Sequence, residues 1–286
     1  MAAAEIPTGG NAPDRVEVIL VPLDGSRFAE RALPVASRLA ERLDADIHLL
    51  SVVAKEDHVV HRAAELAEIE LPDRRVHRTV VVDLDPAGAI HEALRRLTRA
   101  VGCIVSHGRG RSDALIRSVA SEVVARGRDP LLVVGPMVEE RRSGHDVVAC
   151  VDDSPASMSL IPVALRWAGL LGESLVVITV AELVPNSVRP GGRRRFGPDG
   201  DVDAFLTSLV KPVRDLGHHV DTVAVYDPIS PAGGVHSWLR ERPASLVVVS
   251  THARSGLARI VFGSVAARIV HHSRSPVLVV PRTDRT

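Results

Sequence analysis

Short apolar runs rich in β-branched residues alternate along the chain with stretches whose apolar residues recur every three or four positions. The run at residues 16–23 ends at Asp24, Gly25 and Ser26, which is typical of a buried strand followed by a turn. Further strands are predicted at residues 45–53, 76–83, 101–106 and 130–135, and helices at 27–43, 57–70, 86–100 and 115–128. This alternation predicts a doubly wound parallel sheet.

The second half of the chain repeats this order. Its strands are predicted at residues 147–151, 175–181, 220–226, 246–250 and 277–281, and a helix at 201–216. From Asp24 to Val53 the two halves align without a gap, so that Asp24 matches Asp152 and Pro34 matches Pro162. Each proline removes one helix hydrogen bond, so a shared bend is expected. A repeat of this length indicates a duplicated domain.

We therefore predict an α/β fold of two tandem open parallel-sheet domains, each with five strands in the order 3-2-1-4-5 and helices on both faces. Residues 1–14 are expected to form a disordered lead-in, 15–136 the first unit, 137–144 a linker and 145–286 the second unit. The second unit carries extra residues around 185–200, rich in Gly, Pro and Arg, which are predicted to form a mobile loop.

Composition narrows the class of protein. With 45% hydrophobic but only 2% aromatic residues, the core must be built from small aliphatic side chains. A net charge of zero argues against a protein that coats nucleic acid. Cys103 and Cys150 lie in apolar runs and are predicted to be buried thiols in a reducing compartment. Without a signal peptide or a long apolar span, a soluble cytoplasmic protein with no membrane partner is expected.

Candidate binding residues follow the strands, because ligands of an open parallel sheet bind beyond the carboxyl ends of its strands. Asp24 and Asp152 follow the first strand of each half, where they could instead cap the next helix. Gly263 and Ser264 open the last helix, whose unpaired N–H groups and dipole would attract phosphate. A carboxylate facing a helix start suits a nucleotide.

These residues resemble the universal stress protein family in its tandem two-domain form. The resemblance rests on the opening segment 19–26 and on the closing segments 250–266 and 275–280, and it covers nearly the whole chain. ATP-binding members of that family carry the motif Gly-x2-Gly-x9-Gly-Ser/Thr. Here Ser250 and Ala253 replace the first two glycines, while Gly263 keeps the third at the same spacing.

The resemblance implies roles for residues of the second unit. Asp152 would face the adenine–ribose end of ATP, and the backbone of Val180 would read the adenine edge. The phosphates, with or without Mg²⁺, would lie against the helix start. The implied binding residues are Asp152, Val180, Ser250, Ala253, Gly263, Ser264 and Val265.

The first unit departs further from the motif. Gly108 matches its second glycine, but Val105 replaces the first, and Arg117 stands where the third belongs. The long side chain of Arg117 is expected to crowd the phosphates, although it could also contact them from the side. The equivalent residues of this weaker site are Asp24, Val52, Gly108 and Ser118. ATP binding is therefore predicted chiefly in the second unit.

Several enzyme motifs are missing. Lys55 and Lys211 are the only lysines and neither follows a glycine, so the chain has no Walker A loop. His107 and His252 hold equivalent loop positions, where each could act as a base or brace the loop. No histidine or cysteine spacing indicates a metal site. We expect no metal and no catalysis beyond very slow ATP hydrolysis.

The fifth strand of each half is wholly apolar, and such an edge must be paired or covered. The two are expected to pair within the chain, and two chains could then form a homodimer. The leading hypothesis is a stress-response switch or scaffold in which ATP orders the segment 251–262. The alternative is a scaffold that binds no nucleotide and acts through dimerisation; a nucleotidyl transferase-like enzyme is a third and weaker hypothesis.

Overall fold

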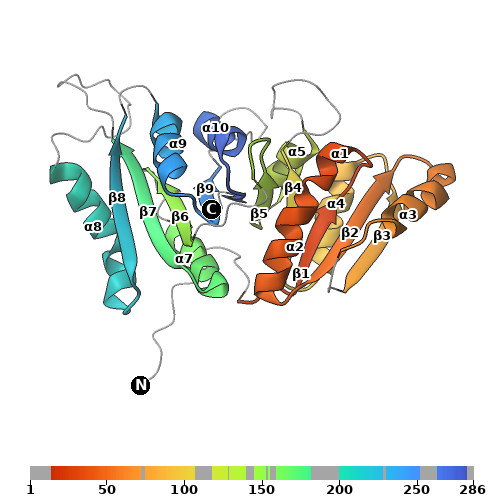
Figure 1. Cartoon of the computed structure of the whole chain (residues 1–286), viewed down its shortest axis with the longest axis horizontal. Coiled ribbons are helices and arrows are strands. Elements are labelled where there is room, and N and C mark those ends of the chain that lie inside the picture. The colour runs from red at the N-terminus through yellow and green to blue at the C-terminus, as the bar shows by residue number, and fades with distance from the viewer. Residues whose placement is uncertain are drawn as a thin grey trace.

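The computed structural model describes residues 14–71, 75–106, 118–127, 129–139, 145–152, 154, 159–181, 200–227, 230–251 and 263–281. Within these ranges the chain forms one ten-stranded sheet with helices on both faces (Figure 1). The predicted α/β class is confirmed. The lead-in before residue 14 and the loop around 185–199 lie outside the described residues.

The strands keep the same order in both halves. The first half contributes β1 (Val18–Pro22), β2 (Asp46–Val53), β3 (Val76–Val82), β4 (Ala100–Val105) and β5 (Leu131–Val134). The second half contributes β6 (Asp146–Val151), β7 (Ser174–Ala181), β8 (Val220–Tyr226), β9 (Leu246–Ser250) and β10 (Val277–Val280). The sheet order is β3-β2-β1-β4-β5-β10-β9-β6-β7-β8, which is the predicted order followed by its mirror.

The two halves join through their fifth strands. β5 and β10 pair antiparallel, with Leu132 opposite Leu278, whereas every other neighbouring pair is parallel. The internal pairing predicted from the two apolar runs is thus present. It makes one continuous sheet and covers the edge that each half would otherwise expose.

Two apolar cores lie on opposite faces of the sheet, and each one crosses the junction. One contains Leu132 and Leu278, and the other contains their neighbours Val133 and Val277. The first core is covered by α1 (Arg27–Glu30), α2 (Ala32–Leu43), α3 (Val59–Ala67), α7 (Leu160–Leu171) and α8 (Gly200–Asp215). The second is covered by α4 (Pro86–Arg96), α5 (Val119–Arg126), α9 (Pro231–Glu241) and α10 (Ser264–His272).

The helix predicted at residues 27–43 is interrupted. α1 ends and α2 begins at Arg31, which places Pro34 in the first turn of α2. Proline has no N–H to donate to Glu30, so the predicted bend takes the form of a break. Pro162 has the same place in the first turn of α7. A short 3-10 helix, η1 (Glu56–His58), likewise precedes α3.

The cysteines are both free thiols. Cys103 is buried and Cys150 is partly buried. Burial raises the pKa of each thiol to about 12, so both are protonated at neutral pH. In the part of the chain that the structure describes, no helix is long and apolar enough to cross a membrane.

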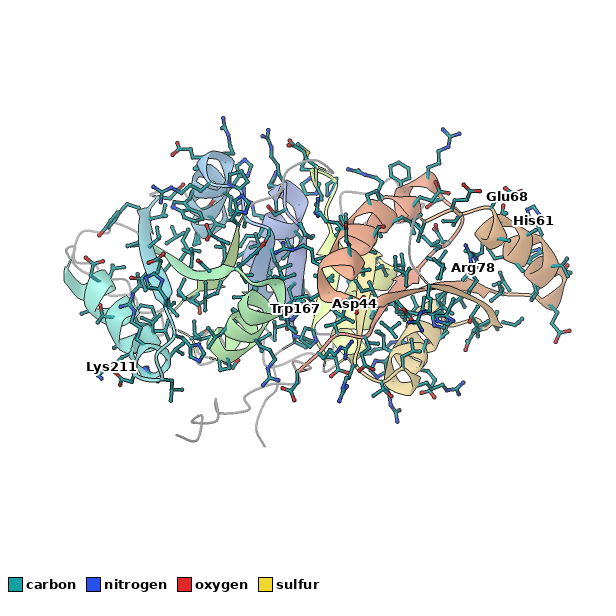
Figure 2. All side chains as sticks on the ribbon, turned by 60° about the horizontal axis from the view of Figure 1, so that its bottom comes forward. Asp44, His61, Glu68, Arg78, Trp167 and Lys211 are labelled. Carbon is teal, nitrogen blue, oxygen red and sulfur yellow. The ribbon has the colours of Figure 1, made fainter. Side chains whose placement is uncertain are left out.

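Figure 2 shows Trp167 of α7 near the middle of the molecule, with His61 and Arg78 toward one end and Lys211 toward the other.

Candidate functional site

The predicted binding residues of the second unit gather at one edge of the sheet. β6 lies between β7 and β9 and is parallel to both, so their carboxyl ends share an edge. Asp152 follows β6, Val180 lies near the end of β7, and Ser250 ends β9. Because β9 and β10 are parallel, α10 must run back between them, and Gly263 at its start lies at the same edge.

Each aspartate that follows a first strand holds the serine two residues later. Oδ1 of Asp152 accepts hydrogen bonds from the backbone N–H of Ser154 at 3.0 Å and from its hydroxyl at 2.5 Å. Asp24 accepts the equivalent pair from Ser26 at 2.9 and 2.6 Å. Ser26, and not Asp24, caps α1, since its hydroxyl accepts from the N–H of Ala29 at 3.2 Å. The capping role considered for Asp24 is therefore indirect.

Two buried hydroxyls, which the sequence analysis missed, fix these aspartate turns. The Ser51 hydroxyl donates to the carbonyl of Leu23 at 2.8 Å, and the Thr179 hydroxyl donates to the carbonyl of Val151 at 2.9 Å. Each carbonyl immediately precedes an aspartate. The one available signal was that Ser51 and Thr179 occupy matching places in the repeat, inside otherwise apolar strands.

The end of β7 packs closely against α9. Val180 pairs with Val225 of β8. Its methyl carbons lie 2.9 and 3.1 Å from where a β-carbon on Gly234 would be, so a larger residue at position 234 would press on β7. Val52, the equivalent residue of the first unit, pairs with Val81. Both valines are half-buried.

The last helix of each unit begins differently. In the first unit Ser118 is the N-cap of α5, and its hydroxyl accepts the N–H of Ser121 at 3.1 Å. In the second unit the N-cap of α10 is Gly263, which provides no side-chain cap, and the matching Ser264 is the exposed first residue of the helix. The first-turn N–H groups of α10 therefore lack the side-chain acceptor that α5 has.

Ser250, which replaces the first glycine of the motif, is buried. It pairs with Val280, and the N–H of Thr251 still donates to the carbonyl of Val280 at 3.0 Å. The strand therefore stays within the sheet up to this point. Val265 is half-buried in the first turn of α10. The predicted residues Ala253, Gly108, Arg117, His107 and His252 lie outside the described residues.

An arginine of α3 contacts the aspartate turn of the first unit. Nη2 of Arg62, on α3, donates to the carbonyl oxygen of Asp24 at 3.0 Å. Its Nη1 lies 2.5 Å from the carboxylate of Glu65. Gly25 has a φ of +78°, and a β-carbon there would overlap the Arg62 guanidinium. The sequence analysis did not connect α3 with this turn.

Among the described residues, no group of three or more His, Cys, Asp or Glu side chains could hold a metal ion. The groups assembled at the carboxyl edge are a carboxylate, which accepts hydrogen bonds, and a helix start, whose N–H groups favour an anion.

The repeated strand order and the repeated aspartate turn define a protein of two doubly wound α/β units. Residues 145–281 match the model of the universal stress protein family. The chain is 25% identical over 293 aligned positions to a universal stress protein of Mycolicibacterium smegmatis, covering 92% of this chain and 96% of that one. A universal stress protein of Mycobacterium tuberculosis is 27% identical over 207 positions, covering 67% of this chain and 62% of the relative.

A solved structure gives the same fold. The crystal structure of a universal stress protein from Archaeoglobus fulgidus aligns with a TM-score of 0.66 at 19% identity, covering 93% of this chain and 98% of that one. Residues 145–281 thus match the universal stress protein family, and over most of its length the chain is similar to a universal stress protein of Mycolicibacterium smegmatis.

Proposed function

We propose that the protein binds ATP at the carboxyl edge of its second unit and acts as a nucleotide-dependent switch or scaffold in a stress response. The observation that carries this proposal is the start of α10, where Gly263 leaves the first turn without a side-chain cap. A helix start of this kind favours an anion through its N–H groups and its dipole. Asp152 lies at the same edge of the sheet, after the strand next to β9.

The two ends of the site suit the two ends of ATP. The carboxylate of Asp152 has acceptor capacity for ribose hydroxyls, and the serine contact holds it in place. Val180 brings strand backbone to the adenine position. Gly263 allows phosphate to approach the helix, and Ser264 adds a hydroxyl at its first residue. The phosphates would lie away from the carboxylate of Asp152, which limits the repulsion between the two negative charges. Bound Mg²⁺ would reduce this repulsion further.

The first unit is the weaker candidate. Its helix start already uses the Ser118 hydroxyl as an acceptor, so a phosphate would have to displace that contact. We propose that a chain carries one nucleotide, in the second unit. No catalytic role is proposed beyond very slow hydrolysis, and a cytoplasmic location and a homodimer stay predictions.

The effect of binding would follow from the position of the site. Its residues border β9, which pairs with β10 at the junction of the two halves. A ligand that favours one arrangement of this edge shifts the population toward it. The segment expected to become ordered, 251–262, lies outside the described residues after Thr251.

Replacing Gly263 tests the site. Gly263→Arg would fill the approach to the helix start and is expected to abolish saturable binding of a fluorescent ATP analogue while leaving the circular dichroism spectrum unchanged. Gly263→Ala is the matched control, because φ −56° and ψ 148° suit any residue and the N–H groups are kept. Equal affinity of the arginine variant and the unmodified protein would contradict the helix-start site.

The same titration separates the two main hypotheses. If the unmodified protein, with Mg²⁺ present, shows no saturable binding, ATP has no role here. The chain would then be a scaffold that keeps the shape of the family without its ligand.

A further inference from the structure

The nucleoside end of the first unit is complete in its framework. The Asp24 turn holds Ser26 as the Asp152 turn holds Ser154. The Ser51 hydroxyl supports the Asp24 turn as the Thr179 hydroxyl supports the turn of the second unit. Nothing in this framework explains why nucleoside should prefer the second unit.

Arg62 is the residue of α3 that lies against this end of the first unit. Its side chain is only 15% exposed although it lies on a surface helix. It hydrogen-bonds the backbone of Asp24 and is held from behind by Glu65, three residues later on the same helix. The guanidinium therefore has one contact on the turn and one on its own helix.

Gly25 makes this arrangement possible. The guanidinium lies where a β-carbon on residue 25 would be, so only glycine leaves room for it. The second unit has Asp153 at the matching position of the repeat. The repeat therefore does not keep this glycine in the second unit.

We propose that Arg62 hinders nucleoside binding in the first unit, because its guanidinium lies against the Asp24 turn. This proposal rests on the proposed function, since it assumes that the aspartate turn is the nucleoside end. A ligand entering the first unit must displace the charge-assisted contact of Arg62 with Asp24. Displacing this contact is expected to weaken binding on the order of 10- to 100-fold, so adenosine concentrations that just saturate the first unit without Arg62 leave it largely empty when Arg62 is present.

Adenosine is the appropriate probe, because without phosphates it reports on the nucleoside end alone and is indifferent to the Ser118 cap. Equilibrium dialysis with radiolabelled adenosine would be made on Asp152→Ala, which lacks the second-unit aspartate, and on Asp152→Ala/Arg62→Ala. The single variant is expected to show no saturable binding. The double variant is expected to bind about one adenosine per chain, if the first unit is uncovered.

Arg78→Ala in the same background is the matched control. Arg78 of β3 donates to the carbonyls of Leu66 and Ile69, at the far end of α3 from Arg62, both at 2.8 Å. Its removal loosens α3 without uncovering Asp24, so no adenosine binding is expected. Adding Asp24→Ala to the double variant must abolish the new site, which assigns that site to the first unit.

Two results would overturn the proposal. One is a folded Asp152→Ala/Arg62→Ala protein that binds no adenosine. The other is adenosine binding by Asp152→Ala alone that is lost on adding Asp24→Ala, because the first unit would then be open with Arg62 in place. Failure of the proposed function would give a different result, because the unmodified protein would then bind no ATP whatever the Arg62 variants do.

Discussion

The two halves approach each other closely at a single glycine. Gly135 directly follows β5, and a β-carbon there would overlap the carbonyl oxygen of Val270 in α10. A backbone oxygen inside a helix cannot move aside as the tip of a flexible side chain can. Gly169 in α7, by contrast, has no atom within 4 Å of its would-be β-carbon.

Gly135→Ala is therefore expected to lower the free energy of unfolding by about 1–3 kcal/mol, the usual cost of overpacking. Gly169→Ala is expected to raise it by up to about 1 kcal/mol, because alanine favours a helix over glycine. Urea unfolding followed by circular dichroism measures both. An alanine at position 135 that costs nothing would show that α10 does not lie against β5.

The residue scale is also where the sequence is least informative. The aspartates could be found because they follow strands in a repeated pattern, and Gly263 because it opens the last helix. The support from Ser51 and the cover from Arg62 could not, since each joins elements through a contact that spacing along the chain does not encode. Gly25 is an example: a glycine at this place predicts a turn, but it does not predict that Arg62 lies against that turn.

At the scale of elements, the last helices of the two units begin at different positions relative to their matching serines. Ser118 lies outside α5 and caps it, whereas Ser264 lies inside α10. The sequence aligns these serines, so they looked alike before the structure was known. A serine caps a helix only when it lies just before the first turn, so that its hydroxyl can accept a hydrogen bond from a backbone N–H of that turn.

Removing each hydroxyl should therefore have unequal effects. Ser118→Ala is expected to cost about 1 kcal/mol of unfolding free energy through the lost cap. Ser264→Ala is expected to cost less than about 0.5 kcal/mol, as for an ordinary surface position. Thermal or urea unfolding of the two variants compares them directly. A larger loss for the alanine at 264 would mean that Ser264 is the real cap of α10.

Most elements could be predicted because apolar β-branched runs mark buried parallel strands clearly. Helix bounds were less exact: the stretch 27–43 breaks at Arg31, and α3 ends at Ala67. Proline, turn geometry and tertiary contacts decide such ends, and none of these is visible in apolar spacing alone. The predicted bounds of the two units and of the linker stay predictions.

At the scale of the molecule, the junction combines apolar pairing with a buried charge. Nη1 of Arg42 lies 2.5 Å from the carboxylate of Glu173, and Nη2 donates to the carbonyl of Leu171 at 2.6 Å. The Glu173 side chain is only 5% exposed, and the Ser245 hydroxyl also donates to it. These contacts connect α2 of the first half with the end of α7, on the face of the sheet that these two helices share.

A continuous sheet with two shared cores should unfold as one unit. Trp167 and Trp238, the only tryptophans, both lie in the second half, so tryptophan fluorescence reports on that half alone. Circular dichroism reports on both halves. The two urea transitions of the unmodified protein are expected to coincide. A fluorescence midpoint clearly separated from that of circular dichroism would show that the halves unfold independently.

The measurement that tests the central claim most directly is the number of ATP molecules bound per chain. Equilibrium dialysis of the unmodified protein against labelled ATP and Mg²⁺ should give saturable binding of about one nucleotide per chain, and Gly263→Arg should give none. Binding that never saturates, or that survives in the Gly263→Arg chain, would contradict a site formed by Asp152 and the start of α10.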